Sequence, residues 1–443
     1  MTFSTPSILA LAPILDAPVD GGTKGLPPGL RPIPFRTVGE QGWNALAGDL
    51  PFPQAVLKRS VMERNARWMR DILAETGVAL APHGKTTMSP QLFDLQLANG
   101  SWGITVATAQ QFEICRRFGV KRILVANQLV DAAAMRSVFA ALAADPVLEA
   151  FCLVDSAAGV RRLADAARAT PPGRPLGLLV ELGMAGRRTG CRTDAEAMAV
   201  ARAVAEAAAG GAGVALRGVE GYEGLVVTND AAADEIAVSA FLDRLGTVAR
   251  EIDQAGLFSD GPVLLSAGGS AYYDIVARTL SAVALSRPTQ VVVRSGCYLT
   301  HDSGQYTRLF QHVIRRIPAD WRRHGDLTPA LEVWSMVQSR PEPGLAILTM
   351  GKRDVSYDIE LPIPTHWRPA GATDAPRPVP AGATITAMND QHAYLKLPEG
   401  FDPQVGDLVC CGISHPCTTF DKWQVMMVVE DDYRVSGAIR TFF

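Results

Sequence analysis

The stretch Ala-Pro-His-Gly-Lys-Thr-Thr at residues 81–87 places Lys85 four residues after the end of an apolar run. The run from Val78 to Ala81 predicts a buried strand, and a helical pattern begins near Ser89. Burying an ammonium group is costly, and a partly buried lysine has a lowered pKa that lets its amine form a Schiff base. Lys85 is therefore a candidate for covalent chemistry. The alternative is a strand-end lysine that simply reaches solvent.

A second candidate, Leu-Ser-Ala-Gly-Gly-Ser at residues 265–270, joins a predicted strand to a predicted helix. Backbone N–H groups at a helix N-terminus attract anions, and glycines allow a phosphate to approach the chain closely. Gly268, Gly269 and Ser270 are therefore candidates for a phosphate site. A tight turn with Ser270 as the N-cap of the helix is the alternative.

A glycine-rich loop at residues 183–190 contains Arg187 and Arg188. A guanidinium group held in such a loop can bind a phenolate or a carboxylate. An exposed cationic loop without a ligand is the alternative.

His415 and Cys417 are separated by one residue, so in an extended segment both side chains point the same way. Imidazole and thiolate favour zinc over magnesium or calcium, and two protein ligands leave positions open for water or substrate. His392 and Asp421 are candidates for supporting groups. A buried cysteine beside a hydrogen-bonded histidine is the alternative.

The elements that must position these groups form a regular alternation of strands and helices. About eight strands are predicted, which is the number that closes a (β/α)8 barrel of the TIM type. An open doubly wound sheet is less favoured, because no Gly-x-Gly-x-x-Gly opens a first βα unit. The predicted strands cover residues 78–82, 103–107, 122–126, 150–154, 177–181, 216–220, 263–266 and 290–294.

In such a barrel, functional groups gather at the carboxyl ends of the strands. We therefore expect one polar rim that contains His83, Lys85, Thr108, Asn127, Gln128, Asp155, Glu181, Arg188, Glu220, Tyr222, Ser266 to Ser270, and Arg294 to Cys297.

The chain divides into three predicted parts. Residues 1–50 are rich in proline and glycine and are expected to form an arm that packs with the last part. Residues 51–298 form the predicted barrel. Residues 299–443 contain short apolar runs separated by Pro, Gly and Asp, with helical spacing nearly absent, and predict a mostly β domain.

Composition narrows the class of protein. The 443 residues include 42 basic and 45 acidic residues, a net charge of −3 that favours neither nucleic acid nor an anionic membrane as a partner. The seven cysteines are scattered through a large chain, so we expect a reducing, cytoplasmic environment. No apolar run approaches the length of a membrane span.

Taken together, these motifs resemble the family of D-serine dehydratases and D-threonine aldolases, whose barrel is similar to that of alanine racemase, the fold-type III enzymes of pyridoxal phosphate (PLP). The resemblance extends from about residue 50 to about residue 420. It rests on residues 82–86 (PHGKT), 184–190 (MAGRRTG), 221–224 (GYEG), 266–270 (SAGGS), 294–298 (RSGCY) and 415–417 (HPC).

The resemblance implies a role for each candidate residue. Lys85 would hold PLP as a Schiff base, Arg188 would face its phenolic oxygen, and Tyr222 would lie along its ring. His415 and Cys417 match the metal pair of the family, which is His-x-Cys in the dehydratases and His-x-Asp in the aldolases. The PLP phosphate would be held by Gly268, Gly269, Ser270, Gly296 and Cys297.

Two features depart from the family or remain open. Gly84 stands where the family commonly has alanine, and Thr87 stands where it has histidine. Either Glu220 or Arg294 could face the pyridine nitrogen: a carboxylate would keep it protonated, and an arginine would leave it neutral.

We therefore predict a PLP- and zinc-dependent dehydratase that converts D-serine-like D-3-hydroxy amino acids to a 2-oxo acid and ammonia, with Mn²⁺ or another divalent ion as an alternative metal. A metal-dependent D-threonine aldolase that releases glycine and an aldehyde is the second hypothesis. A non-catalytic PLP-binding protein is the third. By resemblance, we also expect a homodimer.

Overall fold

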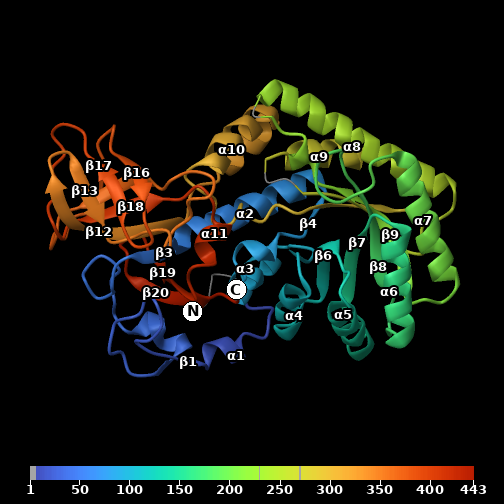
Figure 1. The fold of residues 1–443 in the computed structure, drawn as a ribbon, viewed down its shortest axis with the longest axis horizontal. Helices are drawn as coiled ribbons and strands as arrows, with labels where there is room; N and C mark the ends of the chain where they lie inside the picture. The colour runs from blue at the N-terminus through green and yellow to red at the C-terminus, as the bar shows by residue number, and fades with distance from the viewer. Residues whose placement is uncertain (1–5, 229, 269–270) are drawn as a thin grey trace.

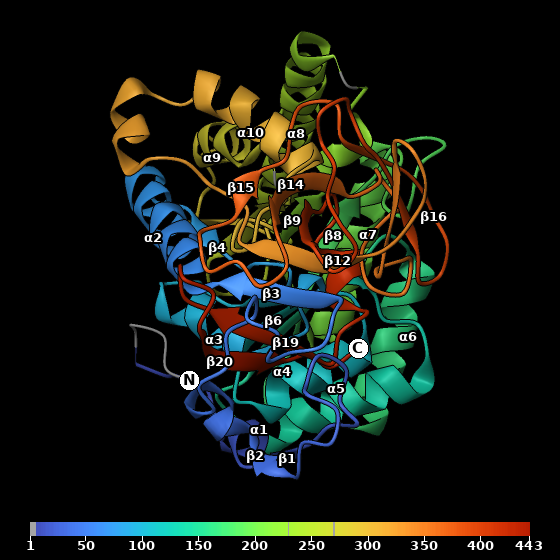
Figure 2. The same ribbon diagram turned by 90° about the vertical axis from the view of Figure 1, so that its left-hand side faces the viewer.

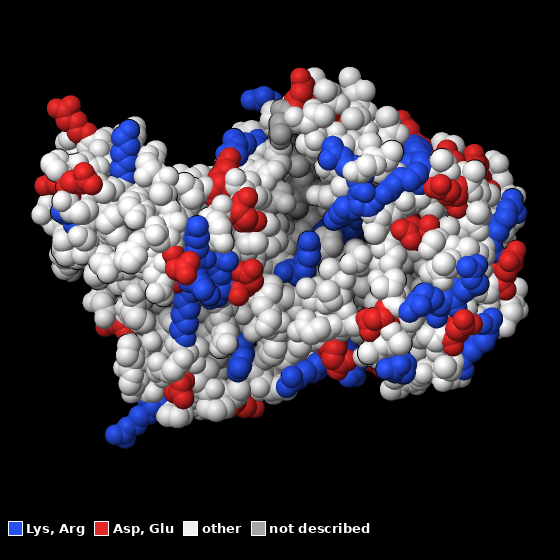
Figure 3. Space-filling view, in the orientation of Figure 1, with Lys and Arg blue, Asp and Glu red and all other residues white. Residues whose placement is uncertain are grey.

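The computed structural model describes residues 6–228, 230–268 and 271–443 of the chain. Two lobes lie side by side, a helix-covered parallel sheet and a mostly antiparallel β lobe (Figure 1). On the face seen in Figure 3 the surface is hollowed between the lobes, and Lys and Arg side chains lie beside the hollow.

The parallel sheet has eight strands in the order β4-β11-β10-β9-β8-β7-β6-β5. A parallel bridge between His83 and Thr105 joins the β4 edge to the β5 edge, so the sheet closes on itself. The predicted (β/α)8 barrel is confirmed. Its strands are β4 (Ala79–Leu80), β5 (Ile104–Val106), β6 (Arg122–Gln128), β7 (Glu149–Val154), β8 (Leu176–Leu182), β9 (Val214–Gly221), β10 (Val263–Ala267) and β11 (Thr289–Val293).

Helices cover the outside of the barrel because each has one apolar face that must be buried. The first barrel helix ends at Gly77, which adopts the left-handed conformation that glycine favours at this position. Thr193 begins another with a capping box to Glu196. The barrel helices are α2 (Arg59–Thr76), α3 (Pro90–Ala98), α4 (Ala109–Arg117), α5 (Ala132–Ala144), α6 (Ala157–Ala169), α7 (Asp194–Ala209), α8 (Ala231–Gln254) and α9 (Tyr273–Ser281).

Side chains fill the interior of the barrel, so it is a packed core and not a pore. This apolar layer separates the carboxyl end of the barrel from its amino end. Its buried members are Ala81, Leu124, Phe151, Leu153, Leu179, Leu264 and Val292.

The β lobe is built around the long strand β12, which pairs antiparallel with three neighbouring strands, β3, β13 and β18. Its strands are β3 (Gln54–Lys58), β12 (Leu331–Glu342), β13 (Leu345–Leu348), β14 (Ile363–Arg368), β15 (Arg377–Pro378), β16 (Thr384–Met388), β17 (Ala393–Lys396), β18 (Leu408–Gly412), β19 (Val425–Val429) and β20 (Val435–Arg440).

Strand β3 precedes the barrel in sequence but belongs to the β lobe in space. It pairs antiparallel with β12 and parallel with β19 (Figure 2). The expected boundary at residue 51 grouped this strand with the barrel, whereas its hydrogen-bond partners lie in the C-terminal sheet. The barrel is therefore inserted between two pieces of the β lobe.

A long helix after residue 300 was not expected. α10 (Gln305–Arg316) packs Phe310 edge-on against Trp68 of α2, with ring centroids 5.3 Å apart. Arg316 forms an ion pair of 2.8 Å with Asp274 of α9. The expectation that helical spacing is nearly absent there was wrong, because Phe310 and Val313 repeat at a helical interval on the buried face.

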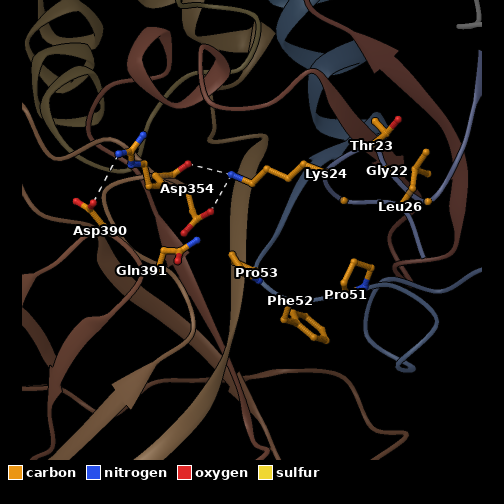
Figure 4. Close-up of a pocket in the computed structure, with 13 residues that line it drawn as sticks. Gly22, Thr23, Lys24, Leu26, Pro51, Phe52, Pro53, Asp354, Asp390 and Gln391 are labelled. Atoms are coloured by element: carbon orange, nitrogen blue, oxygen red, sulfur yellow. Dashed lines mark hydrogen bonds and ion pairs between the residues drawn. The ribbon is translucent and has the colours of Figure 1, made fainter. Parts of the chain in front are cut away.

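The N-terminal arm contains α1 (Ala12–Leu15), β1 (Pro18–Val19), β2 (Ile33–Pro34) and the 3-10 helix η1 (Phe35–Glu40). Lys24 fastens the arm to the β lobe (Figure 4). Its Nζ lies 2.8 Å from the nearly buried carboxylate of Asp354 and 4.0 Å from the ring centroid of Trp423. The contact thus combines an ion pair with a cation–π interaction.

Among the described residues, no helix is both long and apolar enough to cross a lipid bilayer. All seven cysteines are free thiols, and only Cys417 is not buried.

Candidate active site

A cavity of about 800 Å³ opens at the carboxyl ends of the barrel strands. Residues of the β lobe complete its wall, so both lobes contribute to one site. Eight predicted site residues line it together: Lys85, Arg188, Tyr222, Gly268, Gly296, Cys297, His415 and Cys417. The predicted Gly269 and Ser270 lie outside the described residues.

Lys85 projects into this cavity from the 3-10 helix η2 (Gly84–Thr86), which follows strand β4. Packing fixes the backbone there, because a Cβ at Gly84 would lie 2.8 Å from the side chain of Ile104. Within the described chain the Lys85 ammonium makes no hydrogen bond or ion pair. The side chain is exposed to the cavity, so the expected partial burial was wrong. The open space in front of η2 explains the difference.

Hydrogen bonds from the Arg192 side chain stabilise the loop that carries Arg188. The Arg192 guanidinium donates to the carbonyl oxygens of Thr189 and Gly190 at 2.9 Å and to that of Arg188. Gly190 adopts a positive φ of 101°, which lets the chain turn back against Gly183. These contacts fix the backbone of the loop, which positions the exposed Arg188 side chain.

Arg188 and Tyr222 meet at the cavity wall. The guanidinium carbon lies 4.8 Å from the centroid of the Tyr222 ring. Tyr222 packs so closely over Gly224 that a Cβ there would lie 2.5 Å from the tyrosine hydroxyl. The structure therefore brings the two residues expected at the phenolic oxygen and the ring face of PLP into direct contact.

Glu220 and Arg294 are partners in this structure. Arg294 Nη1 lies 2.7 Å from Glu220 Oε2, and it also donates to Ser266 Oγ at 2.6 Å. Burial raises the pKa of Glu220 to about 7; Arg294 opposes this rise and the charge of Glu181 adds to it. The pair sits at the base of the cavity, so a ligand there meets a coupled carboxylate and guanidinium.

The expected phosphate cradle divides into two halves. The Gly268 N–H donates to Glu223 Oε2 at 3.0 Å, so that donor is already used. By contrast, the N–H groups of Gly296 and Cys297 donate to no acceptor within the described residues. A Cβ at Gly296 would lie 2.7 Å from the carbonyl oxygen of His83. Glycine is therefore required at 296, and its N–H with that of Cys297, both without an acceptor among the described residues, suit an anion.

His83 lines the same cavity, and its Nδ1 is buried without a hydrogen-bond partner in the described chain. Burial lowers the pKa of His83 well below its usual value, and the charges of Arg294 and Lys85 lower it further. A buried polar atom without a partner is uncommon, and it is explained where a ligand completes the site.

His415 and Cys417 both reach the cavity, but not from an extended segment. Pro416 is helical in conformation, and the short helix α11 (Cys417–Phe420) begins at Cys417. The expected extended geometry was therefore wrong, although the two side chains do meet. His415 Nδ1 lies 2.6 Å from Asp358 Oδ2, and Thr418 donates to the other oxygen of Asp358 at 2.7 Å.

This arrangement has the form of a metal-binding pair. A ligating histidine commonly places its second nitrogen against a carboxylate, which fixes the ring and raises its basicity. The hydrogen bond from Cys297 and the one from His415 lower the pKa of Cys417 to about 4, and the thiolate is the form that binds metals. Among the described residues, however, no group of three such ligands occurs.

The predicted supporting groups of the metal pair lie elsewhere. Asp421 pairs with Lys422 at 3.2 Å, and the backbone of His392 accepts a hydrogen bond from Asn389 in a hairpin of the β lobe. Asp358 takes the place expected for them. Nothing in the local sequence links Asp358 to His415, because 57 residues separate them.

Not every expected rim residue faces the cavity. Thr108 accepts a hydrogen bond from the N–H of Gln111 and caps α4, and Asp155 accepts from the N–H of Gly190. Tyr306 of α10 lines the cavity near Cys297 and was missed, because that helix was not expected.

The charges of the cavity suit an anionic ligand. Lys85, Arg188 and Arg294 supply three positive charges, against the carboxylates Glu181 and Glu220. With two unused backbone donors, an unpaired lysine and a tyrosine ring face, the described residues fit PLP.

Comparison with known proteins gives a consistent result. Residues 330–429 match a family model described as a putative serine dehydratase domain. A D-threonine aldolase of Arthrobacter sp is 24% identical over 381 residues, covering 86% of this chain and 89% of that protein.

Solved structures extend the similarity to the whole fold. A D-threonine aldolase from Filomicrobium marinum has a TM-score of 0.71 at 20% identity, covering 90% of this chain and 95% of that one. A D-threo-3-hydroxyaspartate dehydratase from Delftia sp. HT23 has a TM-score of 0.66 at 21% identity, covering 90% and 99%. An alanine racemase-like protein from Idiomarina loihiensis has a TM-score of 0.65 at 15% identity, covering 88% and 96%.

These similarities confirm the resemblance to the D-serine dehydratase and D-threonine aldolase family and to the alanine racemase-like barrel.

Proposed function

We propose that this chain, which resembles the D-serine dehydratases and D-threonine aldolases, is a PLP-dependent lyase that acts on D-3-hydroxy amino acids. One observation carries the proposal. The Lys85 ammonium, which has no hydrogen-bond or ion-pair partner among the residues that the structure describes, shares a single cavity with His415 and Cys417 of the other lobe. An amine that can hold a carbonyl cofactor thus lies across the cavity from a pair that can hold a metal.

Each residue of the cavity has a part in holding PLP. Lys85 would bind it covalently, Arg188 and Tyr222 would face its phenolic edge and ring, and Gly296 and Cys297 would offer N–H groups to its phosphate. When bound, PLP withdraws electrons from the carbon that bears the substrate amine. Glu220 and Arg294 would meet the cofactor as a pair.

Lys85 is also placed to move protons. When not bound to the cofactor, Lys85 Nζ would be the base that takes the α-proton of the substrate. Burial and the cationic neighbours of His83 lower its pKa, so its imidazole is neutral and adds no positive charge to the cavity.

We propose elimination in preference to retro-aldol cleavage. His415 and Cys417 would hold a zinc ion, which supplies Lewis-acid chemistry to a substrate hydroxyl. The products would be a 2-oxo acid and ammonia. The His-x-Cys pair supports this choice, because the family aldolases have His-x-Asp.

The second candidate is a metal-dependent aldolase that releases glycine and an aldehyde. The similarity to two D-threonine aldolases favours it. A non-catalytic PLP-binding protein is disfavoured, because the β lobe and its His415–Asp358 contact would then have no use.

We further propose a cytoplasmic homodimer. Tyr357 and Ile359 are large exposed side chains, at 44% and 43%, and they flank Asp358 beside the metal pair. An exposed apolar pair is suited to contact a second subunit. Light scattering of the purified protein measures the assembly; a monomer at micromolar concentration would reject this proposal.

The activity is tested with purified protein and a panel of D- and L-3-hydroxy amino acids, with and without a chelator. We expect 2-oxo acid and ammonia from D-serine and loss of that activity in chelator. Glycine and acetaldehyde from D-threonine would instead support the aldolase.

The cofactor assignment has its own test. Lys85→Ala should remove the visible absorbance of bound PLP, whereas Lys352→Ala on the β lobe should not. An unchanged spectrum in Lys85→Ala would reject the assignment of this lysine.

A further inference from the structure

A second cavity lies at the opposite end of the barrel from the candidate active site. It measures about 560 Å³, within the range of small-molecule sites. Its lining comes from residues at or just before the starts of the strands, and the apolar layer of the barrel separates it from Lys85. The proposed reaction uses no residue at this end of the barrel.

Three arginines converge on this amino-end cavity: Arg122 at the start of β6, Arg174 just before β8, and Arg217 in β9. One carboxylate, Glu149, serves two of them. Arg122 lies 3.1 Å and Arg174 lies 3.2 Å from its oxygens. The other acidic lining residue, Asp260, is exposed at the rim.

Arg217 is the arginine of the three that has no carboxylate as an ion-pair partner among the described residues. Among the described residues it forms no ion pair; its Nη2 reaches the carbonyl oxygen of Pro262 only at 3.4 Å, and its buried Nε has no partner. Burial lowers the pKa of Arg217, and the charges of Arg174 and Arg122 add to this although Glu149 opposes them. The Arg217 guanidinium carbon lies 5.8 Å from the centroid of the Phe151 ring, but no described carboxylate lies within ion-pair distance of it. A half-buried guanidinium without a direct ion-pair partner is costly, so its presence needs a reason.

A β-bulge in the backbone directs Arg217 into the cavity. Leu178 pairs with Leu216 and Leu179 pairs with Gly218, so Arg217 is the extra residue of a bulge between β8 and β9. Bulges re-aim a side chain. Gly177, which pairs with Ala215 just before the bulge, makes room for two side chains, because a Cβ there would lie 2.4 Å from the Phe151 ring and 3.1 Å from Arg217 Cγ.

Apart from Ser259 and Gln290, the other side chains of the wall are mostly apolar. Trp102 and Phe151 pack with ring centroids 5.6 Å apart, and the buried Leu264 lies alongside. A ligand with an anionic head and an apolar body would satisfy both halves of this lining.

We propose that the amino end of the barrel is a binding site for a small organic oxyanion, whose charged head pairs with Arg217 and Arg174. The apolar body of the ligand contacts the wall formed by Trp102 and Phe151. The ligand brings the carboxylate or phosphoryl group that Arg217 lacks as an ion-pair partner within the described part of the chain. This site is independent of the proposed lyase activity.

The test uses phenyl phosphate as the probe and the full-length protein saturated with PLP, so that the cofactor fills any phosphate site near Lys85. Isothermal titration measures binding to wild type, Arg217→Gln and Arg174→Gln. Arg202→Gln is the matched control, since this exposed arginine of α7 lies outside the cavity.

We expect saturable binding to wild type and to Arg202→Gln, and binding about tenfold or more weaker in Arg217→Gln, because a charged hydrogen-bond partner is lost. Inorganic phosphate should bind more weakly than phenyl phosphate. Arg174→Gln gives a second reading if Arg217→Gln fails to fold, because Arg174 is exposed.

Three outcomes would overturn the proposal. They are no saturable binding of phenyl phosphate to wild type, binding that Arg217→Gln and Arg174→Gln leave unchanged, and inorganic phosphate that binds as tightly as phenyl phosphate. A protein that takes up no PLP would reject the proposed function, while the effect of these variants would still decide this site.

Discussion

Asp358→Asn should weaken metal binding without removing either metal ligand. The carboxylate accepts a hydrogen bond from His415 Nδ1 at 2.6 Å, which orients the imidazole and raises its basicity. Asparagine has nearly the same shape and can still accept this bond, but it carries no charge. The change therefore isolates the electrostatic part of the contact.

The size of the effect follows from the geometry. A hydrogen bond to a charged group contributes about 1.5–3 kcal/mol. The Asp358 side chain is 41% exposed, and solvent screens a contact of that kind. We therefore expect Asp358→Asn to lose about 1–2 kcal/mol of metal-binding free energy, which corresponds to a dissociation constant roughly five- to thirtyfold larger.

The assay is competition for zinc between the purified protein and a chromophoric chelator at fixed pH. Asp421→Asn is the matched control, because Asp421 lies at the end of the same short helix but pairs with Lys422. We expect the control to bind zinc as wild type does. His415→Ala should abolish the binding.

Two results would contradict this reasoning in different ways. Affinity within twofold of wild type in Asp358→Asn, with binding lost in His415→Ala, would show that the carboxylate does not support the ligand. Unchanged binding in both variants would show that the metal pair itself is wrongly assigned.

Three further predictions concern stability and cofactor retention. Burial raises the pKa of Glu220 to about 7, so between about pH 4.5 and pH 7 the native state binds one proton more than the unfolded state, and stability should fall as pH rises through this range. The melting temperature of Glu220→Gln should lack this decline. If wild type and Glu220→Gln gave the same pH profile, this prediction would be refuted. Lys24→Met leaves a nearly buried aspartate unpaired and should cost about 1–3 kcal/mol, whereas Lys396→Met on an exposed strand position should cost little, as measured by urea unfolding. Gly296→Ala puts a methyl group 2.7 Å from the carbonyl oxygen of His83 and should lower both the melting temperature and the PLP content, read from visible absorbance; full PLP content would count against the cradle.

The barrel could be predicted because each strand carries its own signal. All eight predicted strands exist, with ends that differ by up to two residues, since apolar runs bounded by turns mark buried parallel strands without reference to distant partners. The placement of β3 could not be read in the same way. Its pairing with β12 and β19 depends on contacts across hundreds of residues, and its local pattern only indicates a strand.

The candidate site was predictable where glycines and charged residues mark loops, and less so where partners are distant in sequence. Lys85, Arg188 and Tyr222 lie in motifs at strand ends, and the structure places them in one cavity. Asp358 carries no local signal that ties it to His415. Whether a group is buried or exposed, as for Lys85, depends on the shape of a cavity that no local pattern contains.

The position of β3 in the C-terminal sheet has a consequence for synthesis on the ribosome. Val56 pairs with Met427, so the partner strand is made 371 residues later. At about 5–20 residues per second, the first strand waits roughly 20–70 s with an unpaired edge. The last barrel strand ends at Val293, so the barrel can close while the nascent chain still lacks its C-terminal third. Exposed strand edges promote aggregation. We therefore expect the yield of folded protein to depend on chaperones that shield this segment during translation, and expression of the C-terminal part without β3 to give insoluble material.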